Sequence, residues 1–441
     1  MAPNGDPVIL AFPASVLQMD VSTGYPNIAV RRFAVCTRYV YIDIASTRQR
    51  QNSHRRPQLR PLYSEQQEML AATVREFAAK ELAPRAAEVD ESEKFPHQQF
   101  KGLAELGLTG LTIDEAHGGS GGDYRDMMAV VEEVGAACGS TSTVLVTHVS
   151  LGSQTINRFG STEQKDRWLP QLAAGEKIAA FALTEPQTGS DALGLSTTII
   201  DDGDSYVVNG TKLFCTNAGA ADVFSVFVTQ DRSLGYRGIS TIVVERGTPG
   251  FTINPQHGKM GMRGCETAEL VFDNCRVPKE NLLGKPGDGY RIALKILDSS
   301  RIMIAAQCLG LASGALDAAI DYARQRKAFG SVIGKKQAIQ FMLADMATEL
   351  DAARLLTFRA ASLHDAGLPY SKESAMAKLY ASEASGRIAS KALQIHGGVG
   401  YFKPSVVERI YRDQRVTEIY EGTSEIQRLV ISRDILGEMP D

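Results

Sequence analysis

The stretch SYVVNGTKLFCT, residues 205–216, consists of two runs that favour β-strands, joined by the pair Asn209-Gly210. Such a pair between apolar-rich runs is typical of a tight hairpin turn, so we expect two antiparallel strands here. Further short β-prone segments follow, separated by turn residues: GISTIVVE, GFTINPQ and AELVFDNCRVP. We therefore predict a small antiparallel sheet domain over residues 181–287.

The segments on either side of this sheet domain have helical periodicity. Residues 63–180 include SEQQEMLAATVREFAAKELAP, with one glycine-rich break at HGGSGGD, and we expect an all-helical domain there. After Gly289 no proline occurs until Pro369, and amphipathic stretches rich in alanine and leucine dominate. This composition favours a helical bundle over residues 288–441, so the predicted fold class is α+β.

The first 60 residues differ from the rest in charge. They carry eight arginines, no lysine and three aspartates, a net charge of +5, whereas the remaining 381 residues carry a net −9. An Arg-rich, acid-poor leader is typical of an organelle transit peptide, but a disordered extension or an incorrectly assigned start site would have the same composition. We therefore treat residues 1–62 as a separate leader that we expect to be disordered. The negative remainder argues against non-specific nucleic-acid binding.

Cysteine spacing and hydropathy exclude two further classes. The six cysteines have no C-x-x-C spacing and no nearby histidines, which argues against a zinc site and favours a reducing compartment. The most apolar run, residues 302–320, is interrupted by Gln307 and Asp317. We expect a buried bundle helix there and no membrane span, and hence a soluble protein.

One carboxylate near the C-terminus has no evident structural use. In IYEGTSEIQRL, residues 419–429, Ser424 and Gln427 have the spacing of a capping box, so a helix is predicted to begin near Ser424. Glu421 precedes that cap and neither caps the helix nor joins its charged face. Taken alone, it is either an exposed loop glutamate or a functional group.

Five motifs occur in one order along the chain: FALTEPQTGSDA, NGTKLFCTNAG, RQRKAFG, QIHGGVG and IYEGTSEIQRL. In this order and approximate spacing the chain resembles the acyl-CoA dehydrogenase family, and is most similar to its short-chain members. The resemblance runs from about residue 63 to the end. It implies an N-terminal helical domain, a central β-domain, a C-terminal four-helix bundle, FAD between the last two domains, and a homotetramer. Residues 1–62 have no counterpart in the family pattern.

The resemblance also implies which residues hold FAD. Hydroxyls and free backbone amides would hydrogen-bond the flavin ring, and Phe214 stands where the family often has tryptophan, which removes an indole donor. The residues expected along the flavin are Phe181, Leu183, Thr184, Ser190, Phe214, Thr216, Thr423 and Glu425. Those expected at the pyrophosphate and adenine end of FAD bound to a neighbouring subunit are Arg326, Phe329, Gln337, Gln394, Gly397 and Gly398. Without the motif order, Arg326 would be interpreted as a solvated helix charge.

The catalytic base implied by the resemblance is Glu421, acting on the α-carbon of a thioester. Burial would raise its pKa, and hydrogen bonds from its own backbone amide and a flavin ribityl hydroxyl would stabilise the developing enolate. Some relatives carry the base just before the arginine matched by Arg301, where this chain has Ser299 and Ser300. The substrate contacts implied are Ser190, Asp298, Arg301, Gly422 and Arg433. Either arginine would otherwise form an ordinary ion pair.

The function implied is FAD-dependent α,β-dehydrogenation of short-chain acyl-CoA to trans-2-enoyl-CoA, with electrons passed to an electron-transferring flavoprotein. A dehydrogenase for branched short acyl groups, an acyl-CoA oxidase and a non-catalytic CoA-binding relative are the alternatives. The segment STVLVTHVSLGSQTI, residues 142–156, would close an acyl tunnel or pack a core, and we favour a core role for its His148. The expected location is the bacterial cytoplasm, or the mitochondrial matrix if the leader is a transit peptide.

Overall fold

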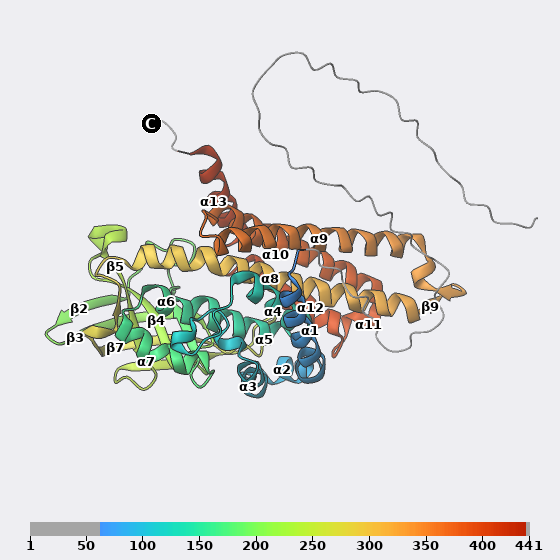
Figure 1. Cartoon of the computed structure of the whole chain (residues 1–441). Coiled ribbons are helices and arrows are strands. Elements are labelled where there is room, and N and C mark those ends of the chain that lie inside the picture. Colours follow the sequence, from blue (N-terminus) through green and yellow to red (C-terminus); the bar gives the residue numbers. More distant parts are fainter. Residues whose placement is uncertain (1–61, 438–441) are drawn as a thin grey trace, which may run out of the picture. The chain divides into compact units, whose positions relative to one another are not determined.

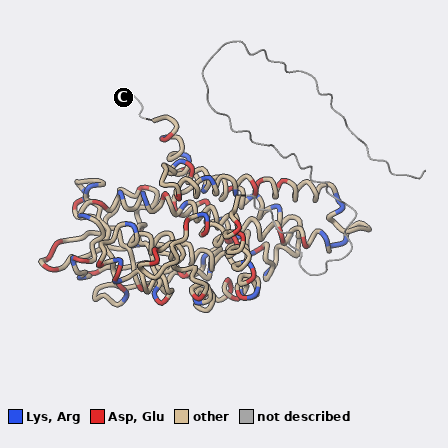
Figure 2. The backbone as a smooth tube through the Cα atoms, in the orientation of Figure 1, with Lys and Arg blue, Asp and Glu red and all other residues tan. Residues whose placement is uncertain are grey.

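A computed structural model describes residues 62–437 of the chain (Figure 1). The predictions for the leader and for Cys36 fall outside the described residues, except at Leu62. Figure 2 shows that Lys and Arg positions are interspersed with Asp and Glu positions over the described helices and strands.

The N-terminal part is helical, as predicted. Its longer helices begin at side-chain caps, which satisfy backbone N–H groups that have no partner inside the helix. Capping boxes start α1, α4 and α7, at Ser64, Asp123 and Ser161. The α-helices are α1 (Glu65–Phe77), α2 (Ala86–Ser92), α3 (His97–Glu105), α4 (Tyr124–Ala137), α5 (Gly139–Val146), α6 (Ser153–Phe159) and α7 (Thr162–Ala173).

The central part is one sheet of eight strands. Seven follow the order β6-β7-β3-β2-β4-β5-β8, and the eighth, β1, pairs with β4. The strands are β1 (Ala179–Ala182), β2 (Thr198–Asp202), β3 (Ser205–Thr216), β4 (Val223–Thr229), β5 (Ile239–Glu245), β6 (Phe251–Gln256), β7 (Thr267–Pro278) and β8 (Leu282–Leu283). Most pairs are antiparallel, but β1–β4 and β2–β4 are parallel. The predicted antiparallel sheet is therefore mixed.

The predicted hairpin at Asn209-Gly210 is wrong. Residues 205–216 form the single strand β3, and the hairpin turn lies earlier, where Asp202 of β2 pairs with Ser205 of β3. Gly210 has a φ of 142° and marks a register shift against β7. A Cβ there would lie 2.7 Å from the Cα of Thr197, so glycine is needed for close approach of the backbone rather than for a turn.

The C-terminal part contains the long helices of the molecule. They are α8 (Gly289–Gln325), α9 (Gln337–Asp365), α10 (Ser371–His396) and α12 (Val406–Arg415), with the short α11 (Gly398–Tyr401) and the terminal α13 (Ser424–Leu436). A small hairpin, β9 (Lys327–Ala328) and β10 (Ser331–Val332), joins α8 to α9. Helices α8 and α10 contact each other and both contact α9 and α12. The predicted order along the chain, a helical part, a sheet part and a second helical part, is confirmed.

Helix α8 connects the two ends of this arrangement, since it runs from beside the sheet to the β9–β10 hairpin (Figure 1). It is the only helix in the described part that is long and apolar enough to cross a membrane, but 89% of its most apolar window is buried inside the protein. Its apolar composition is therefore explained by contacts with α4, α9, α10 and α12.

Candidate active site

The candidate base, Glu421, lies in a short loop between the turn Val416–Glu418 and helix α13. Its φ of 53° and the φ of 94° at Gly422 place two consecutive residues in the left-handed region, which is costly for a residue with a side chain. Lys378 of α10 and Gln427 of α13 each donate to the Gly422 carbonyl oxygen at 2.8 Å. Gln427 also reaches the Glu421 carbonyl oxygen at 3.2 Å. Two buried side chains from two helices thus hold this strained backbone.

The cap of α13 differs from the prediction by one residue. The helix begins at Ser424 as expected, but its N-cap is Thr423, whose hydroxyl accepts from the Ile426 amide at 3.4 Å. Gln427 does not complete a capping box, because its side-chain amide is bound to the loop carbonyls. The predicted Ser424–Gln427 capping box is therefore wrong, and Gln427 stabilises the Glu421 loop instead.

The Glu421 carboxylate is half-buried against α8. Burial raises its pKa to about 7, although a hydrogen bond from the Ser300 hydroxyl and the charges of Lys378 and Arg301 act in the opposite direction. Ser300 occupies the place where some relatives are expected to carry the base. The two alternative positions for a base are therefore in contact here, and one of them supplies a hydroxyl to the other.

The backbone amide of Glu421 is available to a bound group. Within residues 62–437, no backbone or side-chain acceptor receives a hydrogen bond from this N–H. The neighbouring carbonyls, by contrast, are bound by Lys378 and Gln427. The loop therefore presents an ionisable carboxylate and an unused N–H donor from the same residue.

Asp298 and Arg301, two predicted substrate contacts, lie one turn apart on α8 beside this loop. Their ion pair has an Nη1–Oδ1 distance of 2.7 Å, and Ser371 donates to the same Asp298 oxygen at 3.0 Å. Arg301 is only 4% exposed, and its Nε has no hydrogen-bond partner among the described residues. The ion pair and a substrate role are compatible, because one N–H of the guanidinium remains unused.

Two other predicted substrate contacts are not part of this cluster. Arg433 is exposed in the last turn of α13, and Ser190 is exposed in the segment that follows β1. Glu425, a predicted flavin contact, is exposed in the first turn of α13, where a hydrogen bond involving Thr423 lowers its pKa. The structure thus brings Glu421, Gly422, Asp298 and Arg301 together. The side chains of Ser190, Glu425 and Arg433 are exposed elsewhere on the surface.

The ends of β1 and β3 bring together the predicted flavin contacts of the sheet. The Leu213 amide donates to the Thr184 carbonyl at 2.8 Å, and the Cys215 thiol lies 3.5 Å from the Phe181 carbonyl oxygen. This pairing sets Phe181, Leu183 and Thr184 beside Phe214 and Thr216. Phe214 has a φ of 55° and is 63% exposed, so a large aromatic ring stands free next to two threonines. This surface fits a planar ring with polar edges.

A fully buried ion pair, not predicted from the sequence, anchors the segment that follows β1. Lys212 Nζ lies 2.7 Å from Glu185 Oε1 and 3.2 Å from the Leu183 carbonyl oxygen. Glu185 also accepts from the amides of Ser196 and Thr197. Burial alone would raise the pKa of Glu185, but the charge and hydrogen bond of Lys212 lower it to about 2. The pair fixes both ends of the segment that carries Thr184 and Ser190.

The remaining cofactor predictions lie at the other end of α8. Tyr322 stacks on His396 with ring centroids 4.4 Å apart, so the C-terminal ends of α8 and α10 are neighbours. The predicted residues here are all at least partly exposed: Arg326, Phe329, Gln337, Gln394, Gly397 and Gly398. Phe329 is 94% exposed, and a Cβ on either glycine would meet no atom within 4 Å. These residues therefore form an exposed surface that could accept another molecule.

The distance between the two groups matters for what one chain can bind. Ser300 and Arg326 are 26 residues apart along α8 and its end. At about 1.5 Å per residue this corresponds to roughly 40 Å, farther than one dinucleotide molecule reaches. A cofactor that contacts the Phe214 and Glu421 region therefore cannot also contact Arg326 of the same chain.

Strained backbone occurs at three of the predicted site residues. In the described part of the chain, non-glycine residues with positive φ include Phe214, Phe329 and Glu421. Such conformations are held by the surrounding structure, as at Glu421, or by a tight turn, as at Phe329 between β9 and β10. Three independent sequence motifs thus share one conformational property.

Polar groups under the Glu421 loop were not predicted from the sequence. Gln307 is fully buried, donates to the Thr143 hydroxyl at 2.7 Å and accepts from the Tyr420 hydroxyl. Lys378 is equally buried. It stands on the same face of α10 as the buried residues Ser374 and Ala381, but its spacing alone does not show that this face is buried.

The 142–156 segment packs in the core. Val144, Leu145 and Val146 are buried in it. His148 Nε2 lies 3.0 Å from the Leu172 carbonyl oxygen, and its Nδ1 accepts from the Ala179 amide at 3.1 Å. Burial lowers the His148 pKa to about 4, so the ring is neutral. The core role predicted for His148 is confirmed.

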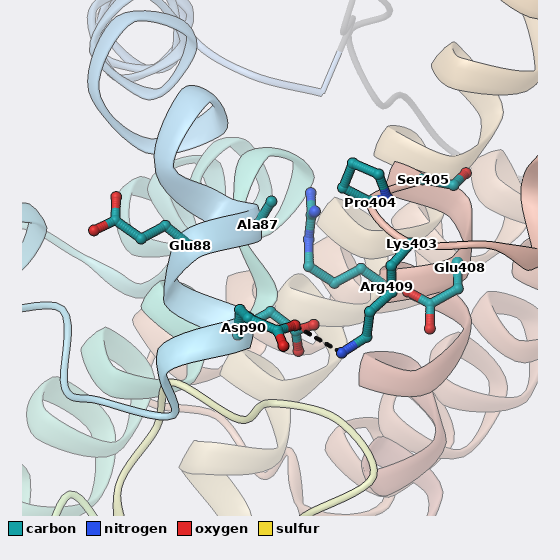
Figure 3. A pocket seen from close by; sticks show the side chains of 9 residues that line it. Ala87, Glu88, Asp90, Lys403, Pro404, Ser405, Glu408 and Arg409 are labelled. Carbon is teal, nitrogen blue, oxygen red and sulfur yellow. Dashed lines mark hydrogen bonds and ion pairs between the residues drawn. The ribbon is translucent and has the colours of Figure 1, made fainter.

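A separate cavity of about 300 Å³ lies between α2 and the segment 403–409 (Figure 3). Asp90, Lys403 and Glu408 line it, and none of its lining residues is a predicted site residue. Nearby, Arg412 pairs with Asp90 at 2.7 Å, which ties α12 to α2. This cavity marks a junction between helices and not the site around Glu421.

Comparison with known proteins identifies the chain. Residues 64–176, 180–275 and 287–436 match, in turn, the acyl-CoA dehydrogenase N-terminal, middle and C-terminal domains. The chain belongs to the acyl-CoA dehydrogenase family. Members of this family are flavin-dependent oxidoreductases of fatty acid metabolism.

Two curated relatives illustrate the similarity. The mitochondrial short-chain specific acyl-CoA dehydrogenase of Mus musculus is 50% identical over 372 residues, covering 84% of this chain and 90% of that protein. The acryloyl-CoA reductase (NADH) of Anaerotignum propionicum is 48% identical over 373 residues, covering 84% of this chain and 94% of that protein. Relatives of similar identity thus carry names for opposite directions of the reaction.

Solved structures of family members share the fold. Butyryl-CoA dehydrogenase from Megasphaera elsdenii is 40% identical with a TM-score of 0.83, covering 85% of this chain and 99% of that one. A glutaryl-CoA dehydrogenase from Mycobacterium smegmatis, in complex with FADH2, is 32% identical with a TM-score of 0.82, covering 87% of this chain and 97% of that one. The predicted family and fold class are therefore confirmed.

Proposed function

We propose that this acyl-CoA dehydrogenase oxidises short-chain acyl-CoA thioesters to trans-2-enoyl-CoA with FAD as cofactor. The observation that carries the proposal is Glu421, a half-buried carboxylate whose pKa is raised to about 7, on a strained loop with an unused amide. A general base is most effective when its pKa lies near the working pH. Glu421 has that property, and an unassisted surface glutamate does not.

Each group around the loop has a role in this scheme. Glu421 removes the α-proton of the thioester, and its own N–H hydrogen-bonds the thioester carbonyl as negative charge develops there. One such donor is worth about 3–4 kcal/mol of transition-state stabilisation. Arg301, paired with Asp298, orients the substrate and keeps positive charge beside the carboxylate. Ser300 holds the carboxylate in one orientation.

The flavin, when bound, supplies the acceptor for the hydride that leaves the β-carbon. The residues suited to hold its ring are Phe181, Leu183, Thr184, Phe214 and Thr216, at the ends of β1 and β3. The opposite group, around Arg326, suits a diphosphate, because a guanidinium offers two parallel N–H donors to phosphate oxygens. Since the two groups are roughly 40 Å apart, we propose that Arg326 serves FAD held mainly by another copy of the chain.

We further propose a homotetramer that passes electrons to an electron-transferring flavoprotein. The exposed aromatic and glycine surface around Phe329 and Gly397 supports association with a second copy. An NADH-dependent reductase is the second candidate, because the Anaerotignum propionicum relative carries that name at 48% identity.

The purified yellow protein, mixed with butyryl-CoA without oxygen, tests the proposal. We expect loss of flavin absorbance and formation of crotonyl-CoA, measured spectrophotometrically and by mass spectrometry. Turnover should then require an artificial electron acceptor or an electron-transferring flavoprotein. A protein that leaves butyryl-CoA unchanged but oxidises NADH with crotonyl-CoA would establish the reductase instead. A colourless protein that does neither would contradict both.

A further inference from the structure

Lys378 is a buried ammonium group without a carboxylate partner. It is fully buried on α10, and no ion pair between its Nζ and an Asp or Glu oxygen occurs within the described residues. The hydrogen bond of its Nζ is to the Gly422 carbonyl oxygen at 2.8 Å. Most buried lysines are paired, because removing an ammonium from water costs several kcal/mol. An apolar residue such as methionine would fill the same space without that cost.

The surroundings of Lys378 show what its charge acts on. Glu421 from the loop, Glu418 from the preceding turn, and Cys308 and Arg301 from α8 face it. Arg301 is already paired with Asp298. The lysine charge therefore has Glu421 and Glu418 as its acidic neighbours, and its hydrogen bond fixes the residue that follows Glu421.

We propose that Lys378 is a positioning residue for the base: its hydrogen bond holds the left-handed loop, and its buried charge stabilises the ionised form of Glu421. The inference deepens the proposed function and rests on Glu421 being the base. The Lys378 side chain therefore acts on Glu421 in two ways. The carbonyl contact sets where the carboxylate points, and the charge sets how readily it gives up its proton before it accepts another from substrate.

The charge effect has a definite sign. Burial raises the pKa of Glu421 to about 7, and Lys378 is among the groups that lower it from a still higher value. Removal of the charge therefore raises the Glu421 pKa further. Because only ionised Glu421 accepts the α-proton, the acid limb of the kcat/KM profile moves to higher pH.

The first test does not depend on activity. Lys378→Gln keeps a hydrogen-bond donor but removes the charge, and its effect on thermal unfolding is measured with Glu421 intact and in a Glu421→Gln background. At pH 7.5 both groups are largely charged, since burial also lowers the Lys378 pKa to about 8. We expect Lys378→Gln to lower Tm by roughly 2 °C more when Glu421 is intact than in the Glu421→Gln background. At pH 5.5, where Glu421 is protonated, the two decreases become equal.

The second test uses the pH profile with butyryl-CoA. We expect Lys378→Gln to move the acid limb up by about one pH unit, and Lys378→Arg, which keeps the charge, to restore most of that shift. Lys391→Met is the matched control, because Lys391 lies on the same helix but pairs with Glu349 at 3.1 Å, away from the loop.

Three outcomes overturn the inference: equal Tm losses with and without Glu421 at pH 7.5, an acid limb that does not move in Lys378→Gln, or an equal shift in Lys391→Met. The tests also separate the inference from the proposed function. If the wild-type protein does not oxidise butyryl-CoA, the proposed function fails, while the unfolding cycle still decides whether Lys378 and Glu421 are coupled.

Discussion

The two ends of helix α8 carry different kinds of site. Near Ser300 and Arg301 the polar groups are buried, paired and supported by α10 and α13 of the same chain. Near Arg326 the predicted residues are exposed, and Phe329 has almost no contact with the rest of the chain. The first end is complete as one chain folds. In the proposed function, the second is completed by another copy of the chain.

The largest expected effect on activity is at the Glu421 site. Glu421→Gln keeps the size of the side chain and removes the proton acceptor, so the rate of flavin bleaching by butyryl-CoA should fall by about 10²–10⁴-fold. FAD content and oligomeric state should not change, because they depend on other surfaces. Bleaching at close to the wild-type rate in stopped-flow measurements would remove Glu421 from the mechanism.

A smaller effect is expected at the exposed end. Arg326→Ala should weaken FAD binding by about 10- to 100-fold, the loss of one charged hydrogen-bonding group, with weaker assembly on dilution. Arg359→Ala is the control, because Arg359 is an exposed arginine of α9 that pairs with Glu373. Fluorescence of released FAD and sedimentation velocity measure the two properties. Full flavin retention after dilution would contradict the role of Arg326.

The comparison becomes sharper when the two variants are combined in one oligomer. Co-expression of Glu421→Gln and Arg326→Ala chains with different tags yields mixed assemblies. If sites are shared between copies, one site of each mixed pair has both residues intact, and activity reappears at dilutions where each pure variant is inactive. Mixed assemblies that remain as inactive as their parents would place both residues in one chain's site.

Acyl length is expected to have a moderate effect. The kcat/KM for butyryl-CoA should exceed that for octanoyl-CoA, since each methylene accepted or refused is worth about 1–3 kcal/mol in an apolar pocket. Isobutyryl-CoA is the first branched substrate to compare. A preference for octanoyl-CoA would reject the short-chain assignment and leave the dehydrogenase chemistry intact.

The smallest effect is expected from removal of residues 1–60. These residues include no matched motif and precede α1, so the truncated protein should retain FAD, assembly and turnover within about twofold of the full chain. Loss of soluble protein in gel filtration would show that the leader contributes to folding.

Local sequence patterns predicted individual helices and strands better than they predicted which residues contact one another. Apolar spacing after Ser424 gave the start of α13 correctly, because a helix is specified within a few residues. The Asn209-Gly210 pair misled, because the same glycine that permits a turn also permits two backbones to approach closely. The two interpretations differ only in what lies opposite the glycine, and here that is Thr197, 13 residues earlier.

The candidate site shows the same limit. Glu421 could be singled out because it had no local role, and Arg301 because it matched a motif. Ser300, Lys378 and Gln427 reach the loop from three helices, up to 121 residues away in the sequence. No local pattern encodes such a meeting. Lys378 in particular violates the expectation that lysines face water, and only the packing of α8 and α10 shows why.

The left-handed backbone at Phe214, Phe329 and Glu421 has a consequence for reading other genomes. Each such residue costs about 1–2 kcal/mol relative to glycine, so glycine at any of the three positions should raise the free energy of unfolding. A gene copy that no longer needs the chemistry should drift to glycine or asparagine at these positions, and become more robust as it loses activity. Glycine at all three positions of a related chain would then be expected to accompany higher stability and lower activity.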